Sequence, residues 1–172
     1  MSNIKRFGDW KNASRLSKGL KNDIVDANKI ALKQVGLKTE REVVKYIQSQ
    51  PSDWPPLDEK YLKRKTKPTS GSPRGKSNKM LINTGTYIGK ITSYVIDATK
   101  KVFVGIKSKD VSKDGEPLVT IGHVLEYGSE KRNVKARPHF GPVKKMMIKK
   151  IREENLFTEY LNKALKRKYG LK

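Results

Sequence analysis

The sequence contains no cysteine and only two histidines among its 172 residues. The absence of cysteine excludes disulfide bridges, thiolate catalysis, iron–sulfur clusters and cysteine zinc sites, and two imidazoles are too few for a dedicated histidine metal site. The sequence also has no run of about eighteen apolar residues and no pattern typical of a signal peptide. We therefore expect no metal, no cofactor and no membrane partner, and we expect synthesis in the cytoplasm.

Acidic residues are scarce relative to basic ones. Lys and Arg number 39 against 17 Asp and Glu, which leaves a net charge of +22. This excess is more than solubility requires and indicates a negatively charged partner, either nucleic acid or an acidic protein. Sequence-specific DNA recognition has less support, because no zinc finger, RNP-type aromatic motif or clear helix-turn-helix is evident.

The N-terminal region carries the strongest periodic pattern. Apolar residues recur there at spacings of three and four, which predicts one stripe along a helix: Leu16, Leu20, Ile24, Ala27, Ala31 and Val35. Gly36 interrupts the pattern, which resumes at residues 43–47 and stops at Pro51. The region is therefore either one long bent helix or two helices that meet near Gly36.

The central region combines a turn, a basic segment and a hairpin. Trp54 lies in a Ser-Asp-Trp-Pro-Pro turn, and we expect it to pack back against the core after the first helix. A short helix around residues 57–64 leads into a flexible basic loop at about 64–79, which is rich in Lys, Arg, Pro and Gly. Two β-rich runs, 91–96 and 102–106, then predict an antiparallel β-hairpin.

The C-terminal region is predicted to be mainly helical. An exposed loop at about 107–118 precedes a short helix at 120–127, which Gly128 closes. After a turn with two prolines, apolar residues between Val143 and Leu165 follow helical spacing. The order of elements predicts a single α+β domain over residues 1–172, with a long N-terminal helix, a central antiparallel β-hairpin or small sheet, and a C-terminal helix.

Two patterns suggest chemistry only weakly. The segments that begin at Gly71 and Gly85 each place three residues between glycines, whereas a phosphate-binding loop needs four. A small nuclease site built from His123, Glu126 and His139 is a remote alternative, because no second cluster of ligands stands out. The simpler interpretation is that His123 lies beside a surface or interface carboxylate and that His139 packs at a turn of the chain.

Five segments in a fixed order resemble the tail-completion (neck) proteins of tailed bacteriophages, in the virion-morphogenesis family. They are W-P-P-L at 54–57, L-I-N-T-G-T-Y at 81–87, the hairpin strand V-F-V-G at 102–105, H-V-L-E-Y-G at 123–128 and A-R-P-H-F at 136–140. The chain departs from the family pattern at three places. Tyr87 replaces a leucine, His139 is an extra residue in the Arg-Pro-Phe turn, and residues 107–117 form a longer insertion.

The resemblance implies a structural virion protein without catalysis. Such a subunit forms a ring, expected to have six members, at the head–tail junction and joins the capsid connector to the tail. Its partners would be copies of itself and other neck, connector and tail proteins, with non-specific contact to packaged DNA as a further expectation. The residues proposed for the interface or the framework are Trp54, Thr84, Gly85, Glu126, Tyr127, Gly128, Arg137, Pro138 and Phe140.

Four of these residues have specific expected roles. Arg137 is suited to bidentate pairing with a carboxylate or a carbonyl-lined turn, either within the chain or across an interface. Pro138 would hold the chain where the last helix begins. Tyr127 would lie against the sheet, and Gly128 would supply the positive φ that ends its helix.

The alternative function is that of a basic DNA-binding accessory protein that contacts duplex phosphates. The cations considered for phosphates or an acidic partner are Lys63, Arg64, Lys65, Lys67, Arg74, Lys76, Lys79, Lys166, Arg167 and Lys168.

Overall fold

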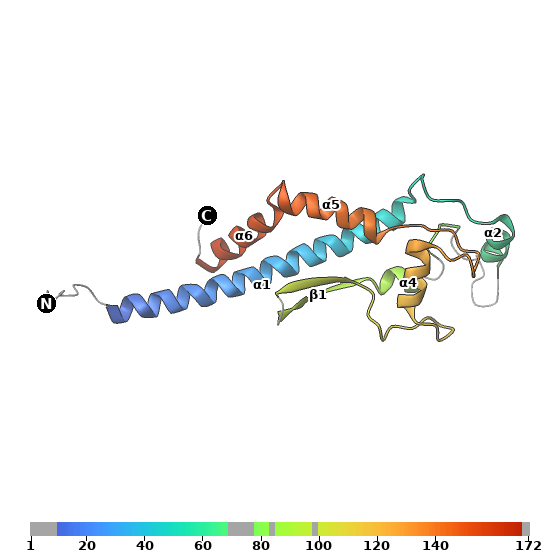
Figure 1. The fold of residues 1–172 in the computed structure, drawn as a ribbon. Helices are drawn as coiled ribbons and strands as arrows, with labels where there is room; N and C mark the ends of the chain where they lie inside the picture. The colour runs from blue at the N-terminus through green and yellow to red at the C-terminus, as the bar shows by residue number, and fades with distance from the viewer. Residues whose placement is uncertain (1–9, 69–77, 83–84, 98–99, 170–172) are drawn as a thin grey trace.

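A computed structural model describes residues 10–68, 78–82, 85–97 and 100–169. One long helix, α1 (Trp10–Ser49), forms the spine of the molecule, with two helices along one side and a two-stranded antiparallel sheet along another (Figure 1). The fold is α+β, as the sequence predicts. The other elements are α2 (Glu59–Thr66), α3 (Thr86–Gly89), β1 (Thr92–Ile96), β2 (Lys101–Gly105), α4 (Leu118–Tyr127), α5 (Phe140–Arg152) and α6 (Leu156–Tyr169).

The N-terminal region is one continuous helix rather than two. Gly36 lies inside α1 where the hairpin approaches most closely, because a Cβ atom at Gly36 would lie 2.6 Å from Cγ2 of Val102 and 3.2 Å from Cβ of Ser93. The glycine therefore serves helix–sheet packing and does not end the helix. The helix ends at Ser49, and Gln50 takes a positive φ of 53° before Pro51.

The predicted hairpin is present, and its two faces differ. β1 pairs with β2 so that Ser93 lies opposite Val104 and Tyr94 lies opposite Phe103. The Ser93 hydroxyl donates to Glu40 of α1 at 2.7 Å, so this residue lies on the face toward the helix. Because strand side chains alternate, the rings of Tyr94 and Phe103 meet on the opposite face, 4.9 Å apart.

The helical C-terminus is divided into α5 and α6. The two helices are separated at residues 153–155, where Asn155 adopts a left-handed φ of 54°, a conformation that asparagine tolerates well. The chain bends at this break, so that α6 packs against α1 (Figure 1). At its end, the Tyr169 hydroxyl donates to Asp23 of α1 at 2.6 Å, and the Lys168 ammonium lies 2.5 Å from the same carboxylate.

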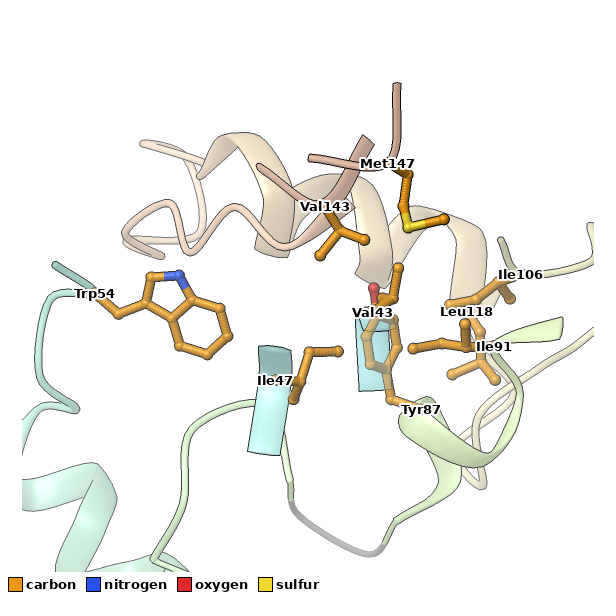
Figure 2. Close-up of a cluster of buried hydrophobic side chains, with 9 residues drawn as sticks. All are labelled: Val43, Ile47, Trp54, Tyr87, Ile91, Ile106, Leu118, Val143 and Met147. Carbon is orange, nitrogen blue, oxygen red and sulfur yellow. The ribbon is translucent and has the colours of Figure 1, made fainter. Parts of the chain in front are cut away.

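The hydrophobic core lies where the second half of α1 meets α5, α4 and the turn after α1 (Figure 2). Trp54 is buried there, as predicted. The cluster consists of Val43, Ile47, Trp54, Tyr87, Ile91, Ile106, Leu118, Val143 and Met147.

The predicted loops are only partly described by the structure. The basic loop expected at about 64–79 overlaps the last turn of α2, and residues 69–77 lie outside the described part of the chain. In the loop at about 107–118, a β-bridge joins Val111 to Pro117, and most of the side chains are exposed. Over the described residues, no helix is both long enough and apolar enough to cross a membrane.

Candidate functional site: a buried polar junction and the surfaces around it

Glu126, at the end of α4, caps the N-terminus of α5. Its Oε2 accepts hydrogen bonds from the backbone N–H groups of His139 (2.8 Å) and Phe140 (2.9 Å), and its Oε1 accepts from Gly141 (2.8 Å). The first amides of a helix have no partner within it, and a negative charge there also interacts favourably with the helix dipole. Because α5 has neither an acidic residue in its first turn nor a side-chain hydrogen bond from its N-cap residue, this distant glutamate supplies the cap.

His139 is fully buried beside this cap and is held in one tautomer. Its Nδ1 lies 3.0 Å from the backbone carbonyl of Arg137, which can only accept, so Nδ1 carries the proton. Nε2 lies 2.6 Å from the Tyr87 hydroxyl and accepts from it. Burial lowers the pKa of His139, although the Arg137 carbonyl and Glu126 oppose the shift, and burial raises the pKa of Tyr87.

Arg137 and Trp54 tie the chain before α5 to the turn after α1. The Arg137 guanidinium donates from Nε to the carbonyl of Pro55 and from Nη2 to the carbonyl of Pro56, both at 3.1 Å. The indole Nε1 of Trp54 donates to the carbonyl of Pro138 at 3.0 Å. Arg137 is only 7% exposed, so the carbonyl-lined pairing predicted for it is a brace within the chain.

These contacts connect most of the segments that carry the family resemblance. The segments at 54–57, 81–87, 123–128 and 136–140 meet in one buried polar junction, which we define by Trp54, Tyr87, Glu126, Arg137 and His139. Tyr87 and His139 are two of the positions at which the chain departs from the family pattern, and they bond to each other. The two residues are 52 positions apart and no local pattern pairs them, so sequence reasoning missed this contact.

The other predicted framework residues have different outcomes. Gly128 ends α4 with φ of 81°, as predicted, and a Cβ there would lie 3.0 Å from the backbone nitrogen of Ala136. Tyr127 does not lie against the sheet; that prediction is wrong. Its side chain is 72% exposed because it follows the buried Glu126 on the outer side of α4, and its ring lies 4.8 Å from that of His123.

Three more predicted residues are Phe140, Gly85 and Thr84. Phe140 is partly buried and packs against the core at the first residue of α5. Gly85 precedes α3 with a left-handed φ of 79°. Thr84 lies outside the described residues.

The remote nuclease alternative is not assembled as a site. Glu126 and His139 lie together, with Oε2 of the glutamate 3.2 Å from Nδ1 of the histidine, but both are engaged in capping and packing. His123 is exposed on α4. Within the described ranges, no group of three or more His, Cys, Asp or Glu residues could hold a metal ion.

The predicted phosphate-binding cations are spread over two regions. Lys63, Arg64 and Lys67 are exposed on or just after α2, and Lys79 is also exposed. Lys65 differs from the surface role considered for it, because it is buried and its ammonium donates to the Lys79 carbonyl at 2.5 Å. The remaining cations are Lys166 and Arg167, which are exposed on α6, Lys168, which is bound to Asp23, and Arg74 and Lys76, which lie outside the described residues.

Comparison of the chain with models of known protein families, with curated proteins and with solved structures finds no match.

Proposed function

We propose that this protein is a structural component of a tailed-phage virion, a neck or tail-completion subunit that assembles as a ring of six between the capsid connector and the tail. The observation that carries the proposal is the buried polar junction. It joins four of the five segments that resemble the family into one internally bonded framework.

The bonding of the junction supports a mechanical role over a catalytic one. Both oxygens of Glu126 accept backbone hydrogen bonds, and the guanidinium of Arg137 is directed at backbone carbonyls. Among the described residues, no buried side-chain nitrogen or oxygen lacks a hydrogen-bond partner. A catalytic group must be able to reach a substrate, whereas groups satisfied in this way fix the relative positions of chain segments.

Ring closure through head-to-tail contacts needs two different surfaces on each subunit. Two exposed apolar surfaces satisfy this requirement. One is the outer face of the hairpin, where Tyr94 is 44% exposed, and the other is the outer side of α4, where Val119 is 43% exposed near the start of the helix and Tyr127 is 72% exposed at its end. We assign these two surfaces to the contacts between neighbouring subunits.

The proposal is tested on purified infectious particles. Mass spectrometry should detect the chain in a stoichiometry near six per particle, and its absence would refute the proposal. Tyr94→Ser and Tyr127→Ser should each abolish ring formation, measured as mass in solution with the other neck proteins present. Ile148→Ser is the control and should leave assembly unchanged, because Ile148, on α5, is 38% exposed, close to the 44% of Tyr94, and lies on neither of the two surfaces.

A DNA-binding accessory protein is the second candidate, and the exposed cations of α2 favour it. Lys63, Arg64 and Lys67 project from one short segment of a chain with a net charge of +22. A stable monomer that binds duplex DNA tightly, with affinity falling steeply between two salt concentrations, would support this function over the first. Each phosphate contact contributes about 0.9 to the slope of log affinity against log salt, so Lys63→Gln with Arg64→Gln should lower the slope by about 2.

A further inference from the structure

The apolar stripe of α1 continues beyond the helix that covers it. Ala27, Ala31 and Val35 are buried, whereas Leu20 is 51% exposed and Ile24 is 41% exposed. The change occurs where the described part of α6 ends, since Tyr169 binds Asp23 there. The first turns of α1 project beyond both α6 and the tip of the hairpin (Figure 1).

The projecting end of α1 lacks the packing that stabilises the rest of the helix. Residues 10–24 make up about four turns of the 40-residue α1, and the end of a helix frays more readily where its apolar face is not covered. Most helical stability in proteins comes from packing of the apolar face. Leu20 and Ile24 therefore present the packing surface that this segment requires.

The charge of the segment indicates the kind of partner. The sequence between residues 10 and 22 contains four cations and no acid, and Lys18 and Lys21 are exposed near the stripe. The first acids along the helix, Asp23 and Asp26, already lie within 2.5 Å and 3.5 Å of Lys168. Two copies of this segment packed together would repel each other, whereas an acidic surface would be attracted.

The width of the stripe favours a helical partner over a membrane surface. Leu20 and Ile24 are four residues apart on one face, and their exposed neighbours Ser17, Lys18 and Lys21 are polar. Val25 is also exposed, at 47%, but it lies on another face of the helix. A narrow apolar stripe of this kind matches packing against another helix, whereas helices that lie on membranes present a broad apolar face.

We propose that residues 10–24 of α1 are a docking helix for an acidic amphipathic helix of another protein. That helix continues the cover of the stripe from the point where α6 ends, with apolar side chains on Leu20 and Ile24 and carboxylates toward Lys18 and Lys21. The proposal does not depend on the ring or the virion role.

The experiment measures binding of the full chain to a designed amphipathic peptide with leucines on one face and glutamates beside them. We expect binding that weakens at high salt and falls at least tenfold in the double variant Leu20→Ser with Ile24→Ser. Val25→Ser is the matched control, since Val25 is 47% exposed on another face of the same helix, and it should retain binding. Circular dichroism verifies that the variants keep the helix content of the unbound protein.

Several results would overturn the proposal. They are the absence of peptide binding, equal binding of a peptide in which lysine replaces glutamate, and equal loss of binding in Val25→Ser. Two other occupants are tested in parallel. If the peptide does not bind, concentration-dependent dimers that require Leu20 and Ile24 would identify a second copy of the chain as the occupant. Binding to anionic phospholipid vesicles through the same residues would instead identify a membrane surface.

Discussion

Replacement of Glu126 by glutamine should destabilise the protein more than any exposed carboxylate replacement. The glutamine oxygen can still accept from the N–H groups of His139 and Phe140, which both bond to Oε2. The new amide N–H₂ would then face the N–H of Gly141, which now bonds to Oε1 at 2.8 Å, so two donors would oppose each other. The junction would lose one hydrogen bond and the negative charge at the start of α5.

The magnitude follows from these contacts. A hydrogen bond to a charged group contributes about 1.5–3 kcal/mol, and a buried donor without a partner costs about 1–3 kcal/mol. We expect the free energy of unfolding to fall by about 3 kcal/mol, which for a chain of this size lowers Tm by about 6–12 °C. Urea denaturation and calorimetry measure both quantities.

The matched control is Glu116→Gln. Glu116 pairs with the exposed Arg132, so its replacement should change stability by no more than about 1 kcal/mol. If Glu126→Gln changed the free energy of unfolding as little as this control does, the capping role assigned to Glu126 would be wrong.

Three further variants probe other parts of the fold. Gly36→Ala should destabilise the protein by about 1–2 kcal/mol, because overpacking against Val102 exceeds the gain in helix propensity. Gly19→Ala is the control in the same helix; a Cβ at Gly19 has no neighbour within 4 Å, so this variant should stabilise the protein by up to about 1 kcal/mol. Equal effects of the two variants in thermal denaturation would contradict the close approach of the hairpin to Gly36. Burial lowers the pKa of His139 in the folded protein, so as pH falls below about 6.5 the unfolded chain takes up a proton at this residue before the folded protein does. The free energy of unfolding should therefore decline by up to about 1.4 kcal/mol per pH unit until the lowered pKa is reached. His139→Gln should remove this part of the dependence of stability on pH, and an unchanged pH profile would show that His139 is not its source. Arg137→Lys should lower the unfolding free energy by about 1–3 kcal/mol in urea, because one ammonium cannot reproduce the forked donation to two carbonyls, and wild-type stability in this variant would argue against the brace.

The sequence alone was sufficient for the α+β class, the long helix and the hairpin. Helical periodicity and β-rich runs are local properties, so they can be recognised in one chain without knowledge of what packs against them. The burial of Trp54 and the positive φ of Gly128 were likewise predictable, since a turn rich in proline and a glycine at the end of a helix restrict the backbone locally.

Tertiary contacts decided the features that sequence periodicity could not. Gly36 has the same sequence signal whether it breaks a helix or admits a neighbouring strand, and only the position of Val102 distinguishes the two. Tyr127 is exposed because the adjacent Glu126 is directed inward to the amides of α5. That cap joins residues at least 13 positions apart, and the bonds from Arg137 to Pro55 and Pro56 span more than 80.

The physical reason is that a polar side chain has several partners available in the unfolded sequence, and burial selects one. The sequence determined which residues could form helices and strands and how much positive charge the chain carries. The folded chain decided which glutamate caps α5, which lysine is buried on α2, and where the cover of α1 ends, because each depends on segments that meet only after folding.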